Sequence, residues 1–422
     1  MRFTKPKGTS DFYGDNIREW QAIEGMIRQM CAEFSIGEIR TPMYENVDLF
    51  KRGVGETTDI VEKEMFVFND AGGRTFALRP EGTANVARAF IENGMGALPR
   101  PVKMYYIMPV FRAEKPQKGR FRQHHQFGVE YLGAGESACD AEVISVAAEL
   151  LRRVGIKGAR PQINSLGCVD CRARYNQALT AFLGDNLDKL CQTCAARFGK
   201  NPLRVLDCKN ASCRELMGGA PLPMDVLDEE CRAHFDDVVR ELKILGIEYD
   251  LAPRLVRGLD YYTRTVFEFI SADLGAQDAL LGGGRYDGLM ESCGGAATPA
   301  VGFGMGLERL LIILGEQGIN LARGDARPVF AGYMGERGRE AAVRLVQDLR
   351  RRGVPAAVDL MGRSVKAQMT YADKIGALYS LVLGDDEIDG GAVKVKNMDS
   401  GESAVRRIDD LAEFFISEVN NE

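Results

Sequence analysis

Long hydrophobic runs are absent from this sequence of 422 residues. A helix that crosses a membrane needs about 20 mostly apolar residues, and no run in the chain approaches that length. The first residues, Met1-Arg-Phe-Thr-Lys, also lack the apolar segment of a secretory signal. We therefore expect a cytoplasmic protein that does not associate with a membrane.

The chain also lacks an excess of positive charge and a P-loop for nucleotides. It has 54 basic and 60 acidic side chains, which argues against a nucleic-acid-binding surface spread over the whole chain. A local basic patch stays compatible with phosphate contacts. The glycine-rich segments 280–289 and 301–310 do not match G-x-x-x-x-G-K-[ST], so neither is a P-loop. The sequence shows no internal repeat, and its length suits two or three domains.

Cysteine, in contrast, is concentrated in one part of the chain: seven of the ten cysteines lie within residues 168–231. Nothing indicates secretion, so disulfides are not expected. Two C-x2-C pairs, nineteen residues apart, fit a structural zinc site made of Cys168, Cys171, Cys191 and Cys194. Further cysteines follow this set, so the thiols exceed the four that zinc needs. Free thiols therefore remain the alternative to zinc.

Residues 257–269 combine a strand pattern with unusual polarity. Their second half alternates with a period of two residues and is rich in threonine, valine, tyrosine and phenylalanine, which predicts a β-strand. The alternation would put Arg264 and Glu268 on the face of Tyr262. A dry core would have to satisfy each of these polar groups, whereas a site for a charged ligand would use them. A surface strand with scattered ion pairs is the alternative.

Two loops could supply further ligand groups. The Pro-Glu-Gly-Thr loop after the strand at 75–78 presents the Glu81 carboxylate and the Thr83 hydroxyl, which suit an ammonium group; a capped helix start is the alternative. Residues 112–122 carry five basic side chains and one acid. Such a run is by default a solvated loop. It leads, however, into 124–130, where arginines beside stackable rings suit phosphates and a purine.

A third candidate is the glycine-rich strand at 301–306. Gly302, Gly304 and Gly306 alternate, so one face of the strand lacks side chains and a ligand can lie against the backbone. Arg309 follows in the first turn of a helix, whose N-terminus also favours anions. Close strand packing with a solvated arginine is the alternative.

Helix and strand patterns organise the rest of the chain. An amphipathic helix is expected at 16–34, β-hairpins at 66–78 and 102–131, and a helix at 140–154. Beyond residue 328, strand and helix patterns alternate. This alternation predicts a small α/β domain with a mostly parallel sheet.

Taken together, these stretches resemble one family, the histidyl-tRNA synthetases of the bacterial type, which are class II aminoacyl-tRNA synthetases. Residues 16–42, 111–130 and 301–312 resemble class II motifs 1, 2 and 3. The stretches 257–262 and 281–289 resemble the two signatures specific for histidine. The resemblance spans essentially the whole chain.

The resemblance implies an α+β catalytic core with an antiparallel sheet, a helical insertion and a C-terminal α/β anticodon-binding domain. The core would comprise 1–167 and 251–320, and the insertion 168–250. Residues 321–327 would form a linker before the anticodon-binding domain at 328–422. Motif 1 would mediate a homodimer.

The implied function is that of a histidine–tRNA ligase. It activates L-histidine with ATP and Mg²⁺ to histidyl-adenylate and pyrophosphate, and then transfers histidine to the 3′ end of tRNA-His. Arg112 and Arg257 would be the catalytic residues, because in-line displacement at phosphorus needs fixed positive charge. Lys115 and Gln117 would contact the tRNA acceptor end. No metal ligand is assigned to this site.

The resemblance also implies which residues bind the small substrates. Glu81 and Thr83 would hold the α-ammonium group, Glu130 and Tyr262 the imidazole nitrogens, and Arg309 the γ-phosphate. The histidine-binding set is Glu81, Thr83, Gln126, Glu130, Arg257, Tyr261, Tyr262, Gly283 and Gly284, the two glycines leaving room for the ring. The ATP-binding set is Arg112, Glu114, Arg120, His124 and Arg309. Asp260, Arg264 and Glu268 would form supporting ion pairs.

Two residues depart from the family pattern. His124 stands where phenylalanine usually stacks on adenine, and a smaller ring offers less stacking area. Lys115 stands where arginine is more usual in the motif 2 loop, and a point charge loses bidentate recognition. The alternatives are a non-catalytic regulatory subunit of ATP phosphoribosyltransferase and a related class II synthetase for another amino acid.

Overall fold

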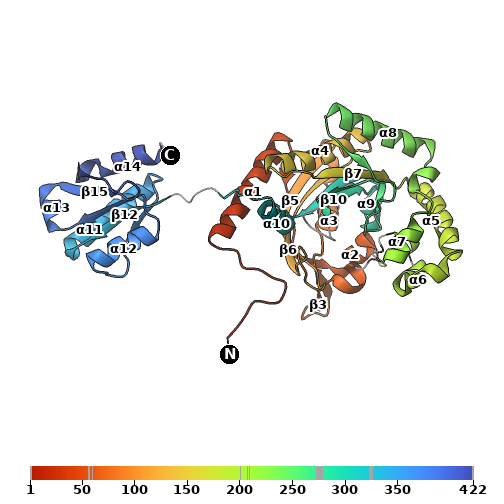
Figure 1. The fold of residues 1–422 in the computed structure, drawn as a ribbon, viewed down its shortest axis with the longest axis horizontal. Coiled ribbons are helices and arrows are strands. Elements are labelled where there is room, and N and C mark those ends of the chain that lie inside the picture. The colour runs from red at the N-terminus through yellow and green to blue at the C-terminus, as the bar shows by residue number, and fades with distance from the viewer. Residues whose placement is uncertain are drawn as a thin grey trace. The chain divides into compact units, whose positions relative to one another are not determined.

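The computed structural model describes residues 2–55, 58, 60–199, 201–206, 208, 210–271, 279–322 and 327–420. The chain divides into two compact units, Met1–Ala322 and Arg323–Glu422 (Figure 1). Residues 323–326 of the expected linker lie outside the described residues. Among the helices that are described, each is too short or too polar to cross a lipid bilayer.

An eight-stranded sheet forms the centre of the first unit. Its order is β1-β5-β6-β11-β10-β9-β7-β8. The six inner strands pair antiparallel, and only the short strands β1 and β8 at the two edges pair parallel. The expected antiparallel sheet is therefore confirmed. The strands are β1 (Gly37–Glu38), β5 (Val102–Phe111), β6 (Gln123–Leu132), β7 (Arg160–Ser165), β8 (Asp250–Leu251), β9 (Thr263–Ile270), β10 (Ala279–Arg285) and β11 (Ala300–Gly306).

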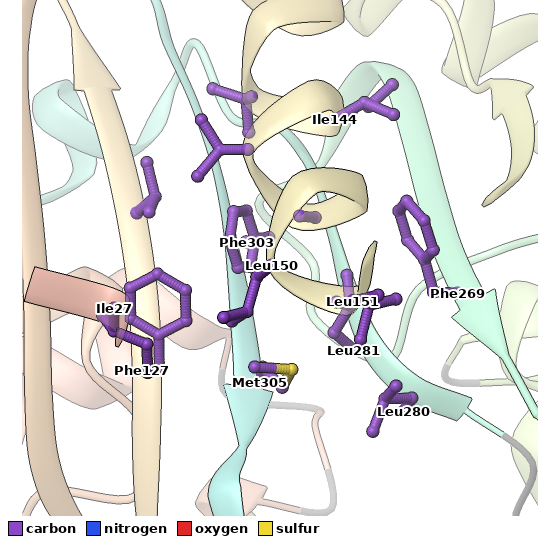
Figure 2. Packing of buried hydrophobic residues seen from close by; sticks show 14 of the residues in the cluster. Ile27, Phe127, Ile144, Leu150, Leu151, Phe269, Leu280, Leu281, Phe303 and Met305 are labelled. Carbon is purple, nitrogen blue, oxygen red and sulfur yellow. The ribbon is translucent and has the colours of Figure 1, made fainter. Parts of the chain in front are cut away.

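Helices cover both faces of this sheet. On one face the main core lies between the strands and α1 (Asp15–Glu33), α4 (Ser137–Arg153), α8 (Glu229–Ile244) and α10 (Leu307–Glu316). Figure 2 shows side chains of α4, such as Leu150 and Leu151, beside Phe303 and Leu281 of the strands. The opposite face packs a smaller core against α3 (Thr83–Glu92) and α9 (Leu289–Ser292), and the candidate site opens there.

The apolar face predicted for the first helix is the buried face of α1. Trp20, Ile23, Ile27 and Met30 are at most 3% exposed. Full burial of each such side chain stabilises the fold by about 1.5–3 kcal/mol.

A three-stranded sheet holds the loop that carries Glu81. Strand β4 (Thr75–Leu78) lies between β2 (Tyr44–Asn46) and β3 (Val67–Asn69), as predicted for the hairpin at 66–78. Helix α2 (Val47–Val54) and the π-helical turn Ile60–Glu64 accompany it. After β4, the buried Arg79 guanidinium donates to the carbonyl oxygens of Thr41 and Pro109, at 2.8 and 2.7 Å. Arg79 thereby joins the motif 1 segment to the motif 2 hairpin.

The segment between β7 and β8 is built from helices and helical turns, as expected for the insertion. These are α5 (Val169–Gly184), α6 (Gln192–Phe198), α7 (Ala211–Met217), α8 and the 3₁₀ turns Leu187–Lys189, Pro202–Val205 and Pro223–Val226. Figure 1 shows α5, α6 and α7 grouped at one end of the first unit.

The second unit has a five-stranded sheet of order β13-β12-β14-β15-β16. The expectation of a mostly parallel sheet is met only in part: β12 pairs in parallel with β13 and β14, but β15 pairs antiparallel with both β14 and β16. The connections before β15 and β16 are too short for the crossover that a parallel neighbour requires. The elements are β12 (Val329–Tyr333), α11 (Gly335–Arg351), β13 (Ala356–Val358), α12 (Val365–Lys374), β14 (Tyr379–Leu383), α13 (Asp385–Gly390), β15 (Ala392–Asn397), β16 (Ser403–Arg407) and α14 (Leu411–Asn420).

Candidate active site

One pocket collects polar side chains from β6, α10 and the loops at 79–83, 112–122 and 257–262, and apolar residues and glycines of β10 and β11 complete its lining. Most residues predicted for substrate binding line it, although they come from four separate parts of the sequence. The predicted residues in the lining are Glu81, Thr83, Arg112, Glu114, Arg120, His124, Gln126, Arg257, Tyr261, Tyr262 and Arg309.

Glu81 both caps the start of helix α3 and faces the pocket, so the capped helix start is confirmed and binding of an ammonium group stays a prediction. Its carboxylate accepts the backbone N–H groups of Thr83 and Ala84, at 2.6 and 2.8 Å, which satisfies two N–H groups at the helix start. Burial raises the pKa of Glu81, whereas these N–H groups and the nearby Arg112 oppose the rise. The carboxylate is thus held rigidly at the pocket wall.

Glu130 lies behind the pocket wall and is completely buried. Its carboxyl group accepts hydrogen bonds from the hydroxyls of Thr83 (2.7 Å), Tyr106 (3.4 Å) and Tyr286. Burial raises the pKa of Glu130 to about 8. At neutral pH the unliganded chain therefore holds Glu130 mainly as the neutral acid, which can donate as well as accept a hydrogen bond.

The glycines of β11 make room for side chains of the neighbouring strand β6. A Cβ atom at Gly302 would collide with Glu130, and one at Gly304 would collide with Gln126. These two β6 side chains therefore cover part of the bare strand face predicted at 301–306, while Gly304 and Gly306 still line the pocket. Gln126 in turn accepts the backbone N–H of Gly82 at 3.0 Å, which joins β6 to the Glu81 loop.

On β10 the pocket-facing glycine is Gly282, not Gly283. A Cβ atom at Gly283 would meet Phe303 and Phe267 in the apolar core, whereas Gly282 lies against the guanidinium of Arg257. Gly284 faces the same side as Gly282, and a Cβ atom there would lie 2.9 Å from the Tyr262 ring. Neighbouring residues of a strand point to opposite sides of the sheet, so Gly283 and Gly284 cannot both face the pocket as predicted.

Arg257 is fixed from two directions. It forms an ion pair with Glu268 on β9, and its guanidinium carbon lies 5.7 Å from the centre of the Tyr262 ring. Burial raises the pKa of Tyr262, with Arg257 opposing the rise, so Tyr262 stays a neutral phenol. The expected support of the site by Glu268 is confirmed.

The other arginines of the pocket are also held. Arg112 donates to the carbonyl oxygen of Pro80 at 3.0 Å, and Arg309 donates to that of Gly119 at 2.9 Å. Glu114 and Arg120 form an ion pair at 2.6 Å. Burial, followed by the charges of Arg120 and Arg112, lowers the pKa of Arg309. This clustering of positive charge favours a polyanionic ligand.

The two adjacent histidines of β6 point to opposite sides of the sheet. His124 lines the pocket, and burial together with Arg112 and Arg309 lowers its pKa to about 3, so the ring is neutral. His125 donates its backbone N–H to Glu308 and packs its ring against Trp20 and Phe12. Only His124 can therefore contact a ligand in the pocket.

Lys115 and Gln117 lie outside the pocket lining, exposed on the motif 2 loop. The backbones of Gln117 and Arg120 bond to each other in a tight turn, which brings this loop back toward β6.

Arg264 breaks the alternation predicted for residues 262–269. It adopts a positive φ of 48°, and the pairing between β9 and β10 shifts beside it. Its side chain consequently forms an ion pair with Glu230 of α8 instead of sharing the pocket face with Glu268. The expected supporting ion pair of Arg264 is confirmed, but its predicted direction is wrong. Asp260 accepts a hydrogen bond from Asn201 at 3.2 Å.

Comparisons with known proteins agree with this geometry. The sequence model for "Histidyl-tRNA synthetase" matches residues 8–181 and 214–310, and that for "Anticodon binding domain" matches 328–418. The histidine–tRNA ligase of Acetivibrio thermocellus is 50% identical over 406 residues, which is 96% of this chain and 97% of that protein. The chain belongs to the histidyl-tRNA synthetase family.

A second relative and two solved structures extend the similarity to the family. The histidine–tRNA ligase of Caldanaerobacter subterraneus is 49% identical over 406 residues, again 96% of this chain and 97% of that one. The apo histidyl-tRNA synthetase of S. aureus has a TM-score of 0.84 at 37% identity, covering 98% of this chain and 100% of that chain. The Nostoc enzyme shares the fold, with a TM-score of 0.69 at 21% identity over 99% of this chain and 100% of that one.

The cysteines of this synthetase do not form the predicted four-ligand set. Among the described residues, Cys168 and Cys171 meet Asp228 and Cys231, whereas Cys191 and Cys194 meet Cys208 and Cys213. The prediction combined one pair from each group, because spacing alone cannot tell which pairs the folded helices bring together. Both groups could hold a metal ion, since the ligand atoms in each lie within 4.8 Å of one another.

Several residues around the synthetase site were not predicted from the sequence. Tyr106 and Tyr286 bind the Glu130 carboxyl group, and Gly282 receives Arg257. Tyr286 lies within the histidine-specific stretch 281–289, so its position carried a signal. Tyr106 carried none, because a tyrosine in a strand is ordinary.

Proposed function

We propose that the chain is a histidine–tRNA ligase that works in the cytoplasm, where tRNA is charged. It joins L-histidine to ATP, forming histidyl-adenylate and pyrophosphate, and then transfers the histidyl group to tRNA-His. The observation that carries this proposal is the single pocket in which Arg112 and Arg257 lie beside Tyr262 and in front of Glu130.

In the first step, a carboxylate oxygen of histidine attacks the α-phosphorus of ATP and pyrophosphate leaves. Charge builds up on the phosphoryl oxygens, so catalysis requires positioning and fixed positive charge. Arg112 and Arg257 would supply this charge at the α-phosphate and Arg309 at the γ-phosphate. Magnesium enters with ATP as part of the substrate and neutralises phosphate charge. Because the three guanidiniums are already bonded to protein groups, little reorganisation is needed.

Recognition of histidine would depend on Glu130 and Tyr262, one for each imidazole nitrogen. A neutral imidazole has one N–H donor and one acceptor nitrogen, and a carboxyl group with a phenol can satisfy both. An amino acid without these groups leaves buried polar atoms unpaired, which costs about 1–3 kcal/mol for each atom. Glu81, Thr83 and Gln126 would hold the ammonium and carboxylate groups, and Tyr261 and Gly284 would border the ring.

The ATP and tRNA contacts complete the proposal. Glu114, Arg120 and His124 would surround the nucleotide, with the neutral His124 ring stacking on adenine. Lys115 and Gln117 would approach the acceptor end of tRNA, and the second unit would bind the anticodon. Each chain would consist of the catalytic core (1–167 and 251–320), the insertion (168–250) and the anticodon-binding domain (328–422). Two chains would form a homodimer through motif 1.

The test is ATP–pyrophosphate exchange with each amino acid in turn. We expect exchange with histidine alone. Exchange with another amino acid instead would identify a related class II synthetase. Binding of histidine without exchange would identify a non-catalytic regulatory subunit, and either result would overturn the proposal.

A further inference from the structure

Four thiols of the insertion meet at one point: Cys191, Cys194, Cys208 and Cys213 lie with their sulfur atoms within 4.8 Å of one another. They come from the start of α6, from α6 itself, from the turn after Val205 and from α7. All four are free thiols. The family model leaves residues 182–213 unmatched, so this group is not part of what defines the family.

Backbone groups around these sulfur atoms are arranged for thiolates. The N–H of Cys191 donates to the Cys213 sulfur at 3.2 Å, and the N–H of Asn210 donates to the Cys208 sulfur at 3.4 Å. Such outer contacts orient ligating sulfur atoms and stabilise their negative charge.

The second cysteine group differs, because it carries its own acceptor. Asp228 accepts the thiol hydrogens of Cys168 and Cys171, at 3.2 and 3.1 Å, and also caps α8 through the N–H of Cys231 at 2.8 Å. These thiols are satisfied without a metal. The first group has no carboxylate among its members.

The region around the first group is too small to be held by packing alone. Helices α6 and α7 have seven residues each, well below the length at which a helix is stable by itself. Among the described residues their core has eight buried members, with partly buried side chains around them, and Cys194 and Cys213 are two of the eight. Small modules of this kind usually need a metal or disulfides.

We propose that Cys191, Cys194, Cys208 and Cys213 bind one Zn²⁺ ion per chain, and that this ion positions the loop that recognises histidine. Four thiolates in a compact group suit tetrahedral zinc, whose sulfur-only sites are structural. The spacing C-x2-C followed by C-x4-C would bring ligands from two short helices and from the turn after Val205 to one ion.

The segment between the second and third ligands reaches the histidine loop. Asn201 donates to Asp260 at 3.2 Å, and Arg204 packs so closely that a Cβ atom at Gly258 would lie 2.9 Å from its Nη1. Leu206 packs in the small core that contains Tyr262. Zinc bonded to Cys194 and Cys208 would hold both ends of this segment in place. The ion therefore limits how far Asp260 and Tyr262 can move.

Metal content tests the site. Purified chain should contain about one equivalent of zinc, and Co²⁺ in its place should give the absorption of a tetrahedral thiolate complex. Cys208→Ser should lower zinc affinity at least roughly tenfold, whereas Cys168→Ser, the matched control in the other group, should keep the zinc. Zinc-free protein, or loss of zinc in Cys168→Ser alone, would overturn the proposal.

The effect on the histidine loop rests on the proposed function, so its readout is separate. Removing zinc from the folded enzyme with a chelator should raise KM for histidine by about tenfold or more and leave KM for ATP nearly unchanged. Asn201→Ala should shift KM for histidine in the same direction while retaining zinc. Equal changes in both KM values, or none, would overturn the link between metal and loop while leaving the metal measurement intact. Absence of exchange in the zinc-loaded enzyme would instead count against the proposed function.

Discussion

At the scale of single residues, Glu130 and His124 show how burial decides protonation in this pocket. Both side chains have pKa values that favour the neutral form. The pKa of Glu130 is raised to about 8, and that of His124 is lowered to about 3. In the proposed function each side chain lies where a neutral partner would be needed, Glu130 for imidazole and His124 for adenine. The positive charge is left to the arginines.

The raised pKa of Glu130 predicts a specific pH dependence of stability. Folded Glu130 keeps a proton that the unfolded chain, with an ordinary pKa of 4.5, releases. Its contribution to the free energy of unfolding is therefore complete at acidic pH and is lost as the pH rises through about 8. Glu130→Gln cannot lose a proton. Denaturant unfolding should show this variant gaining stability relative to wild type between about pH 5 and 8, and a constant difference would contradict the raised pKa.

His124 predicts an effect on ATP binding. His124→Phe should lower KM for ATP by a few-fold, because the larger ring offers more stacking area. KM for histidine should stay unchanged, which serves as the internal control. A rise in KM for ATP would show that the imidazole makes a polar contact that phenylalanine cannot replace.

Site residues could be predicted from the sequence where a polar side chain was unusual for the strand or loop that contains it. Glu81 and Arg257 stood out in the sequence and line one pocket, whereas Glu130 was assigned through the family resemblance and lies behind the pocket. The position of Gly283 was not predicted correctly, because which residues of β10 face the core depends on how β10 pairs with β9 and β11. Tyr106 gave no signal, since only the folded sheet brings it to Glu130.

At the scale of elements, β11 positions the site through what its glycines leave out. Residues of β6 lie across the bare face of β11, with Glu130 opposite Gly302 and Gln126 opposite Gly306. The strand pattern predicted the bare face correctly. Its occupant could not be predicted, because the partner strand follows from the sheet order and not from local sequence.

Gly302→Ala tests this arrangement. The added methyl group would collide with the Glu130 carboxyl group and with the backbone carbonyl oxygen of Val129, so Glu130 should be displaced and KM for histidine should rise by at least roughly tenfold while KM for ATP changes little. Gly315→Ala on α10 is the matched control, because nothing lies within 4 Å of a Cβ atom there. An unchanged KM for histidine in Gly302→Ala would show that Glu130 does not need its position.

Local pattern also failed at two other elements. The alternation through 262–269 is interrupted by the bulge at Arg264, and the second unit turns antiparallel at β15. Both departures arise from pairing between strands. A bulge and a short connection hardly change the hydrophobic pattern of a sequence, so neither feature could be predicted from that pattern.

At the scale of the whole molecule, the two units have separate cores. The buried clusters of the first unit draw only on residues up to 321, and those of the second only on residues from 329 onward. The change of pattern near 320–328 predicted this division. Independent cores imply independent folding.

Removing the second unit should separate the two half-reactions. A chain of residues 1–322 should retain histidine-dependent ATP–pyrophosphate exchange, because every pocket residue lies within it. Aminoacylation of tRNA should fall at least roughly tenfold, through lost contacts to tRNA. Circular dichroism would verify that the shortened chain is folded. Full charging of tRNA by this chain would contradict a tRNA-binding role for residues 328–418.

In the proposed function, the loop at 257–262 brings phosphate chemistry and histidine recognition to one place. The most direct test is the single-turnover rate of histidyl-adenylate formation in Arg257→Ala at saturating histidine and ATP. Arg254→Ala is the matched control, because this guanidinium donates to the carbonyl oxygen of Met217 outside the pocket. We expect a loss of about 100- to 1,000-fold for Arg257→Ala and none for Arg254→Ala. An unchanged rate in Arg257→Ala would contradict this role of the loop.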